Sequence, residues 1–567
     1  MRNARLFLCL LACVCTEFAQ NPAEITSHDE PTTFTSKVNL VTVPVVVRDR
    51  TGNAVAGLKQ EDFQLFDKGK LQTITKFSVE QTGATAPGPG LMAKDGPDKP
   101  ASGQSSLVLP GHYLLYLFDD VHLEFGDLVQ ARTAALKYIS TSLTLTDRAA
   151  IFTTSGQGMQ DLTEDKEKLR EALLRLQPHP IARSSFQDCP EMTYYTGNLI
   201  FNHNDSQALR AAELDAVICG NLQTLNGQLP PAAEQMSRAA ASRWVSQGDA
   251  EARISLSVLK NAILRISSMP GQRTLVLVSP GFVVLEHNLQ EESDILERAG
   301  RAGITINSID ARGLDATPPG GDIANSFHNV QTDAIKDQYR HEADLAAQGI
   351  LAEAAAATGG TAFHNNNDLV EGFRRTSAAP EFRYVLGFSP EPLKNDGSFH
   401  ALKVTVSQGK ELSIQARHGY YAPRHDMDGA AGTKEEIREA MFSRDEPRGI
   451  AVDIETQYFK PSDEKVKLSV LARVDLRQLH FHKVDGRNQN TLTIVWGVFD
   501  RNGNWITGIQ KTLDMRLREE TYAARLSSGI TVKSSFDVTP GSYLVRVVVR
   551  DTEGQLMAAR NGSIEIP

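Results

Sequence analysis

Residues 36–80 have the period-two hydrophobic pattern of β-strands. Apolar side chains occupy alternate positions from Val41 to Val47. The polar segment Asp49–Asn53 follows, and its aspartate and glycine are typical of a tight turn. The pattern therefore predicts a β unit near the N-terminus.

The same pattern of strand, turn and strand returns twice near the C-terminus, in residues 495–508 and 545–558. Each copy has an apolar run, an Asp-x-x-Gly segment and a second apolar run. Asp500 and Asn504 stand where a calcium loop could use them, but the glycine and terminal glutamate of an EF-hand loop are missing. We therefore predict hairpin turns, and immunoglobulin-like β units at both ends of the chain, the second spanning 449–567.

Strand-like and helix-like segments alternate between residues 107 and 388. Short strands separated by helices indicate right-handed crossovers, and so a doubly wound, mainly parallel α/β sheet with helices on both faces. The expected strands are 112–120, 148–154, 273–278, 303–309, 361–363 and 382–388. The expected helices are 128–139, 164–176, 252–268, 289–299, 345–357 and one from 368.

The remaining segments connect or interrupt these units. Residues 81–106 are rich in Gly, Pro and Ser and predict a flexible linker. Residues 178–250 are polar and interrupt the alternation, which indicates an insertion. Residues 389–423 predict a β hairpin that packs on the N-terminal unit or the sheet edge, and 424–448 predict a charged connector.

Composition narrows the classes of function. The chain has 567 residues with 59 basic and 69 acidic side chains, a net charge of −10. This balance argues against a nucleic-acid or anionic-membrane surface. After the N-terminus no stretch approaches the roughly 18 apolar residues of a transmembrane helix, so we predict no transmembrane segment.

The N-terminal sequence predicts export. Two arginines precede a short apolar core, as in a secretory signal spanning residues 1–19. Leu10–Cys13 is similar to a lipobox, which would lipidate Cys13 and give the protein a lipid anchor; simple cleavage near Ala19 is the alternative. The expected location is periplasmic, outer-membrane-associated or extracellular.

Export changes what the cysteines imply. Three of the five cysteines lie in the signal, which leaves Cys189 and Cys219 inside the predicted insertion. Two cysteines in an oxidising compartment most simply form one disulfide. A metal site would need more ligands than two distant thiols supply.

The strand 112–120 carries the first candidate ligands. It ends in Asp119 and Asp120, immediately before a turn and an amphipathic helix. In open α/β sheets, ligands bind at the carboxyl ends of the strands. We therefore expect these carboxylates to mark the ligand edge of the sheet.

Residues 36–423 resemble the von Willebrand factor type A-related proteins of acidobacteria. The resemblance rests on NLVTVPVVVRDRTGNAVAGL, YLLYLFDDVH, QDLTEDKEKLREAL, LVLVSPGF, ITINSIDARGL and YVLGFSP followed by ARHGYYAP. A cysteine-flanked insertion is also typical of that group. The resemblance implies a von Willebrand A-like sheet and an adhesion-type ligand edge.

In the wider family this edge holds magnesium or another divalent cation through Asp-x-Ser-x-Ser, a threonine and a third-loop aspartate. By this resemblance Asp119 and Thr163 match two metal ligands, whereas Val121 and Leu123 replace the serines. The third loop begins at Ser279 and has no aspartate. The neighbouring side chains that could complete such a shell are Asp120, His122, Glu124 and Asp127.

A structural role is the alternative for the same residues. Asp119 and Asp120 could cap the following helix and complement its dipole. Thr163 also precedes a helix and resembles an N-cap. Because the serines and third aspartate are missing, we prefer capping to a metal site, and expect no cofactor.

No catalytic motif appears in the sequence. Ser279 lacks the Gly-x that precedes the serine of a nucleophile elbow, and His341 begins a zinc-protease pattern that no second histidine completes. We therefore expect a non-enzymatic, exported adhesion module that binds an unidentified protein. The alternatives are a cation-dependent receptor, a structural envelope component and a hydrolase using Asp119 and His122. The residues expected at the ligand edge are Asp119, Asp120, His122, Thr163 and Ser279.

Overall fold

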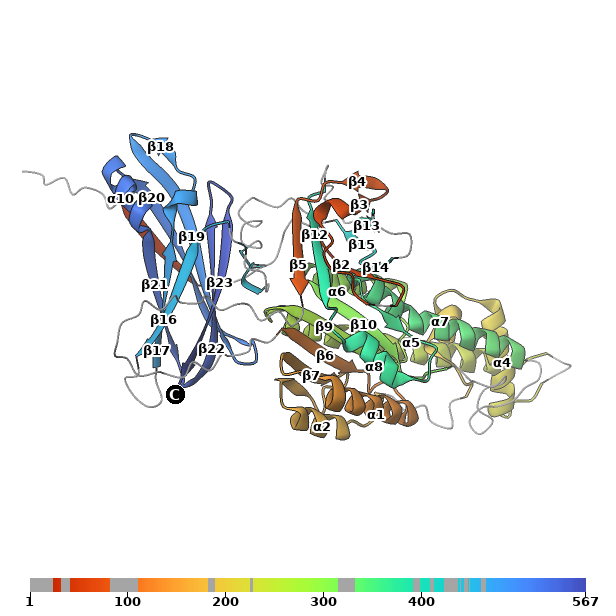
Figure 1. The fold of residues 1–567 in the computed structure, drawn as a ribbon. Helices are drawn as coiled ribbons and strands as arrows, with labels where there is room; N and C mark the ends of the chain where they lie inside the picture. The colour runs from red at the N-terminus through yellow and green to blue at the C-terminus, as the bar shows by residue number, and fades with distance from the viewer. Residues whose placement is uncertain are drawn as a thin grey trace, which may run out of the picture.

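The computed structural model, drawn in Figure 1, shows several β-sheets around one mixed α/β unit. The expected signal segment with Cys13, nearly all of the linker 81–106 and most of the connector 424–448 lie outside the described residues. The structure describes residues 24–31, 41–51, 53–81, 111–181, 189–224, 228–314, 332–390, 398–407, 412–422, 437–438, 440–442, 447, 449–459 and 466–567.

The central sheet has six strands in the order β11-β10-β9-β6-β7-β8. The first five are parallel to their neighbours, and β8 runs antiparallel to β7. This confirms the expected mixed α/β architecture with a mainly parallel sheet. The strands are β6 (His112–Phe118), β7 (Asp147–Thr153), β8 (Gln160–Thr163), β9 (Gln272–Ser279), β10 (Ile304–Asp310) and β11 (Ala362–Phe363).

Helices cover both faces of this sheet because β6 is apolar throughout. Leu114, Tyr116 and Phe118 belong to a core with α1, α2 and α8, whereas the alternate residues Leu115 and Leu117 pack with α5, α6 and α7. The helices are α1 (Phe125–Ser142), α2 (Lys166–Leu174), α5 (Pro231–Ser267), α6 (Leu289–Arg301), α7 (Asp333–Thr358) and α8 (Leu369–Ser377).

The predicted insertion consists largely of helices. It contains α3 (Tyr194–Phe201) and α4 (Ser206–Cys219). The expected disulfide Cys189–Cys219 is present, with the Cα atoms 5.6 Å apart. Residues 231–250, expected in the insertion, instead belong to α5. The helix predicted from residue 252 therefore begins earlier, at Pro231.

The strands of the N-terminal β unit pair with strands that follow the α/β unit in the sequence. Its two sheets have the orders β14-β2-β12-β5 and β15-β13-β3-β4. The expected hairpin region lies on this unit, since β13 pairs with β3 and β14 pairs with β2. The strands are β2 (Val41–Arg48), β3 (Phe63–Asp67), β4 (Lys70–Gln72), β5 (Lys76–Gln81), β12 (Phe382–Phe388), β13 (Phe399–Val406), β14 (Ser413–Ala416) and β15 (Gly419–Tyr421).

Strand β12 corrects one expectation. The alternation placed residues 382–388 in the parallel sheet, but β12 runs antiparallel between β2 and β5. Its buried Tyr384, Leu386 and Phe388 share a core with the valines of β2. A buried apolar strand has the same pattern in either kind of sheet, so the sequence pattern could not choose between them.

The C-terminal unit contains one sheet with the path β1-β20-β19-β22-β23, to which β18 is added, and a second of order β16-β17-β21. Its first strand, β1 (Ile25–Pro31), comes from the N-terminus and pairs with β20. No helix in the described ranges is long and apolar enough to cross a membrane. The other elements are β16 (Val452–Phe459), β17 (Val466–Val474), β18 (His482–Val484), β19 (Arg487–Asp500), β20 (Trp505–Leu517), α10 (Glu519–Ser528), β21 (Ile530–Val538), β22 (Gly541–Asp551) and β23 (Met557–Ile566).

The turn between β19 and β20 is the predicted hairpin turn. The Asp500 Oδ1 atom accepts the Asn502 and Asn504 backbone amides, each at 2.8 Å. These bonds use the carboxylate to close the turn, which accounts for the spacing without calcium.

Candidate functional site

The candidate site lies where the central strands end. Asp119 and Asp120 follow β6, and Ser279 ends the neighbouring strand β9. Phe118 pairs with Val278, so the register places the following residues side by side. The chain leaves β6 and β9 toward opposite sides of the sheet, which makes this the point where the strand order reverses.

Asp119 is buried, and its two carboxylate oxygens are already engaged. Ser279 Oγ donates to Oδ2 at 2.6 Å, and His122 Nδ1 lies 2.9 Å from both oxygens. Burial alone would raise the pKa of Asp119, but the charge of His122 and hydrogen bonds from His122, Ser279 and Thr154 lower it overall. The carboxylate is therefore held ionised inside the protein.

His122 is the basic side chain beside that carboxylate. Burial would lower the pKa of the imidazole, but the charge and hydrogen bond of Asp119 raise it overall, with a smaller contribution from Glu251. The imidazole ring also stacks on Phe282, with the ring centres 5.6 Å apart and the planes at 17°. Its orientation is thus fixed from two sides.

Asp120 connects two loops at the same edge. Its carboxylate accepts the Ser155 backbone amide at 2.8 Å and the Ser155 hydroxyl at 2.5 Å. The other loop contributes His179, whose Nδ1 lies 3.0 Å from Oδ2 of Asp120. Asp120 is 1% exposed, so its role is to hold these loops together rather than to meet a ligand.

These contacts correct the capping alternative. Helix α1 begins at Phe125 after Glu124, whose side chain makes no capping bond. Asp119 and Asp120 bond elsewhere, to the partners described above. The local sequence could not reveal this, because Ser155 lies in the turn after β7 and Ser279 ends β9, both distant in sequence.

Thr163 does not lie at the ligand edge. It pairs with Ala149, which in turn lies beside Leu114, five residues before Asp119. At about 3.3 Å per residue the separation along the sheet is roughly 16 Å. Thr163 Oγ1 instead accepts the backbone amide of Asp165 at 3.1 Å, and Asp165 is the residue that caps α2.

The donor set at Asp119 does not fit a divalent cation of the adhesion type. The hydroxyl positions are occupied by Val121 and Leu123, which are 6% and 3% exposed. The Asp119 oxygens are satisfied by His122 and Ser279, and a hard cation needs about six oxygen ligands. Within the described residues, no group of three or more His, Cys, Asp or Glu side chains is arranged to hold a metal.

The acidic residues near β10 are paired as well. Arg312 binds Asp310 with its Nε and terminal nitrogens at 3.1 and 3.0 Å, and Asp344 at 3.0 Å. Burial and the charge of Glu124 raise the pKa of Asp127, and Arg312 opposes this shift. Asp127 therefore experiences the charges of Glu124, Arg312 and Asp310.

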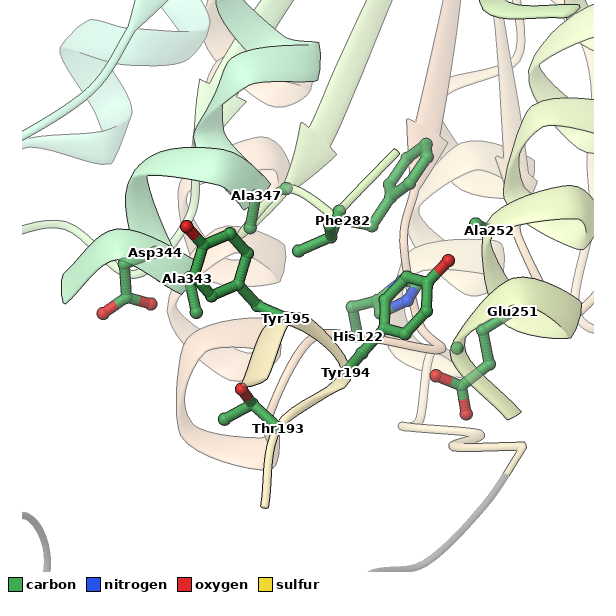
Figure 2. Close-up of a pocket in the computed structure, with 13 residues that line it drawn as sticks. His122, Thr193, Tyr194, Tyr195, Glu251, Ala252, Phe282, Ala343, Asp344 and Ala347 are labelled. Atoms are coloured by element: carbon green, nitrogen blue, oxygen red, sulfur yellow. The ribbon is translucent and has the colours of Figure 1, made fainter. Parts of the chain in front are cut away.

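A pocket of about 210 Å³ opens beside His122. Figure 2 shows that its walls come from separate elements, with Tyr194 and Tyr195 on α3, Glu251 on α5 and Asp344 on α7. The turn after β9 closes the remaining side. The full lining consists of His122, Thr193, Tyr194, Tyr195, Gly248, Glu251, Ala252, Gly281, Phe282, Val283, Ala343, Asp344 and Ala347.

The insertion builds one wall of this pocket. The Tyr194 ring lies against Gly248, where a Cβ atom would come within 2.2 Å of the ring. The Tyr194 hydroxyl donates to Asp249, which also lies 3.0 Å from His287 Nε2. Cys189 precedes α3, so the disulfide constrains the segment that carries this tyrosine.

The turn after β9 needs its glycine. Gly281 has φ +89°, and a Cβ atom there would lie 2.1 Å from the Ala347 carbonyl oxygen on α7. Its amide donates to Ser279 Oγ at 2.9 Å, which orients the hydroxyl toward Asp119. The Ser-Pro-Gly sequence thus serves close packing against α7 and the Asp119 network.

The sequence pointed to only part of this site. Of the five residues expected at the ligand edge, the structure brings Asp119, His122 and Ser279 into one network. The sequence prediction missed the pocket wall from Tyr194 and Glu251. An amphipathic helix pattern identifies helices, but it gives no signal for which side chains from an insertion face a distant loop.

The chain matches no family model and no curated protein. Solved structures with weak similarity include a calcium-binding mutant of Bacteroides uniformis beta-glucuronidase 2, with 12% identity and TM-score 0.14 over 33% of this chain and 19% of that chain. A DUF4785 family protein from Legionella pneumophila has 10% identity and TM-score 0.12 over 33% and 42%. The BSP domain of a biofilm-associated protein has 11% identity and TM-score 0.11 over 32% and 43%. Similarity at this level carries no argument about the function of this chain.

Proposed function

We propose that this protein is an exported, non-enzymatic module of the von Willebrand A-like kind, which binds a protein partner at the carboxyl edge of its central sheet. The observation that carries the proposal is the pocket beside His122. It lies where β6 and β9 diverge, which is the place where open α/β sheets bind their ligands.

The topology supports the von Willebrand A-like assignment. Counted along the chain within the central sheet, the strands have the doubly wound order 3-2-1-4-5-6. The sequence resemblance described above points to the same family. In this proposal the network of Asp119, His122 and Ser279 takes the place of the cation that the family holds at this position.

Exposed apolar side chains at this edge favour a protein partner. Phe125 is 70% exposed at the start of α1, and Leu314 is 50% exposed after β10. Phe125 comes after the carboxyl end of β6, and Leu314 comes after the carboxyl end of β10 in the same parallel sheet. Both side chains follow strands that end at the same side of the sheet as the pocket, and they are the exposed apolar groups that the proposal assigns to the partner.

A hydrolase that uses Asp119 and His122 is the alternative in another class. The favourable observation is that Asp119 orients an imidazole that lines a pocket. Against it, the Ser279 hydroxyl bonds to Asp119, and the hydroxyls of Tyr194 and Tyr195 donate to Asp249 and Glu342. A nucleophile would instead have to bond to the imidazole.

Export is part of the proposal and rests on the N-terminal pattern together with the disulfide. Cys189–Cys219 is the kind of bond that forms and persists outside the cytoplasm. A structural envelope component would share these features but would need no defined partner at the sheet edge.

Affinity capture with matched variants tests the proposed function. The wild-type protein and a Phe125→Asp/Leu314→Asp variant are used to capture envelope proteins, which are quantified by mass spectrometry. Leu145→Asp is the control. Leu145 is 84% exposed, but it precedes β7 and so lies at the amino-terminal end of the parallel strands. We expect a specific partner whose recovery falls about tenfold with the edge variant and is unchanged with the control. Equal recovery with all three proteins would refute the proposed edge.

A further inference from the structure

The size of the pocket limits what can enter it. Its volume of about 210 Å³ is below the roughly 300–1,000 Å³ of pockets for drug-sized ligands. A single long amino-acid side chain is a better match. The exposed Phe125 and Leu314 near the same edge would meet the surface of the partner that presents this side chain.

The ionisable groups that line the pocket are one histidine and two carboxylates, besides the tyrosines. His122 is balanced by Asp119, at 2.9 Å. The Arg312 guanidinium forms ion pairs with both Asp344 and Asp310, so a single positive charge is paired with two carboxylates. Arg253 acts on the neighbouring Tyr194, but the lining itself contains the carboxylates Glu251 and Asp344 and neither a lysine nor an arginine among its described residues.

Glu251 is the carboxylate that best meets a ligand. Its carboxylate accepts a hydrogen bond from a neutral amide, Gln247 Nε2, at 3.4 Å. It lies on α5 near His122, on whose pKa its charge acts, and Figure 2 shows it across the pocket from Asp344. A cation in the pocket would meet Glu251, whereas the Asp344 carboxylate is turned away from the other lining side chains and bonds to Arg312.

The other walls suit the same kind of ligand. Tyr194, Tyr195 and Phe282 contribute aromatic side chains to the lining, and the Phe282 ring stacks on His122. Aromatic faces attract ammonium and guanidinium groups, and they also cover the aliphatic part of a long side chain. An anionic side chain would be repelled by the Glu251 and Asp344 carboxylates that line the pocket.

We propose that the pocket binds the side chain of a lysine or arginine that the protein partner presents. This inference rests on the proposed function and specifies the chemistry of the partner. Glu251 pairs with the cation, Asp344 adds to the field, and the aromatic rings enclose the methylene groups. Phe125 and Leu314 bind the surface from which the side chain extends.

The test uses the whole secreted protein and a small probe. N-acetyl-L-arginine amide is titrated and its binding is measured by ligand-observed NMR, with N-acetyl-L-citrulline amide as a probe of nearly the same shape but without charge. We expect arginine to bind about tenfold more tightly than citrulline. Glu251→Gln should weaken arginine binding by a similar factor, because it removes the charge and keeps the shape.

Glu520→Gln is the control, since Glu520 is exposed on α10 in the C-terminal unit. Equal binding of arginine and citrulline to the wild-type protein would overturn the inference without depending on how any variant folds. Unchanged arginine binding in Glu251→Gln would overturn it as well.

The two proposals fail in different ways. If arginine does not bind but Phe125→Asp/Leu314→Asp still loses the partner, the inference about the pocket is wrong and the edge remains the binding face. If arginine binds through Glu251 but the edge variant keeps its partner, the pocket chemistry stands and the proposed function is wrong.

Discussion

At the scale of single residues, the site depends on a buried pair of opposite charges. Asp119 is 1% exposed, and its ionised form is stabilised by His122 and the Ser279 hydroxyl. Removing one member of a buried pair leaves the other charge without compensation, which typically costs about 3–5 kcal/mol. The Asp119 oxygens that a metal ion would need are therefore already bonded to His122 and Ser279.

The pair should make stability depend on pH in two directions. The pKa of His122 is raised above its ordinary 6.5, so its contribution is complete below about pH 6.5 and is lost as the pH rises through the raised value. The pKa of Asp119 is lowered below 3.8, so its contribution is complete above about pH 4 and is lost as the pH falls through the lowered value. Urea unfolding at a series of pH values, with His122→Gln as the comparison, measures both effects.

We expect His122→Gln to have a lower free energy of unfolding than the wild type near neutral pH. The fall in the free energy of unfolding that the wild type shows as the pH rises should be largely absent in this variant. An identical pH profile for the two proteins would mean that the imidazole stays uncharged and that the pair has been misassigned.

Divalent cations should leave the thermal stability unchanged. Because the Asp119 oxygens are engaged and the nearby Val121 and Leu123 side chains offer no oxygen ligand, millimolar magnesium or manganese should not shift the melting temperature. Differential scanning fluorimetry with and without EDTA measures this. A rise with metal that Asp119→Ala abolishes would restore the cation-dependent receptor.

At the scale of elements, the site is assembled by close packing of segments that are distant in sequence. The turn after β9 contacts α7 through Gly281, and α3 contacts α5 through Gly248. These contacts set the spacing between the pocket walls, so backbone shape matters as much as the side chains that line the pocket.

Gly281→Ala tests this packing. The new Cβ atom would meet the Ala347 carbonyl oxygen at 2.1 Å, and φ is +89°, so we expect the free energy of unfolding to fall by about 2–3 kcal/mol. Gly349→Ala is a matched control in α7, because a Cβ atom there meets nothing within 4 Å. It should leave stability unchanged or raise it by about 0.5–1 kcal/mol. Equal effects in urea unfolding would show that the turn does not pack on α7 as described.

The elements also show how far the sequence could go. Helical and strand periods located the central sheet and the turn at Asp500, because these depend on residues close in sequence. They failed for β12, which has the pattern of any buried strand. The resemblance to the von Willebrand A family failed for Thr163, whose position depends on the pairing of β8. Pairing partners and the facing of an inserted helix are set by tertiary packing, which a single sequence pattern does not contain.

At the scale of the whole molecule, the two ends of the central sheet have different neighbours. The β19–β20 turn of the C-terminal unit meets the amino end, where Arg501 binds Glu164, which also binds Arg148 at 2.6 Å. Gly503 lies against the Tyr113 hydroxyl at the start of β6. The C-terminal unit is thus attached opposite the proposed ligand edge, as Figure 1 shows.

The most direct test of the central claim is site-specific photo-crosslinking. A photoreactive phenylalanine analogue is placed at Phe125 on the carboxyl edge, or at Leu145 on the opposite edge, in the full chain. After irradiation with envelope extract, we predict a discrete covalent adduct from position 125 that position 145 does not give, and that excess N-acetyl-L-arginine amide reduces. An adduct from position 145 alone would contradict the account, because the partner would then contact the other end of the sheet.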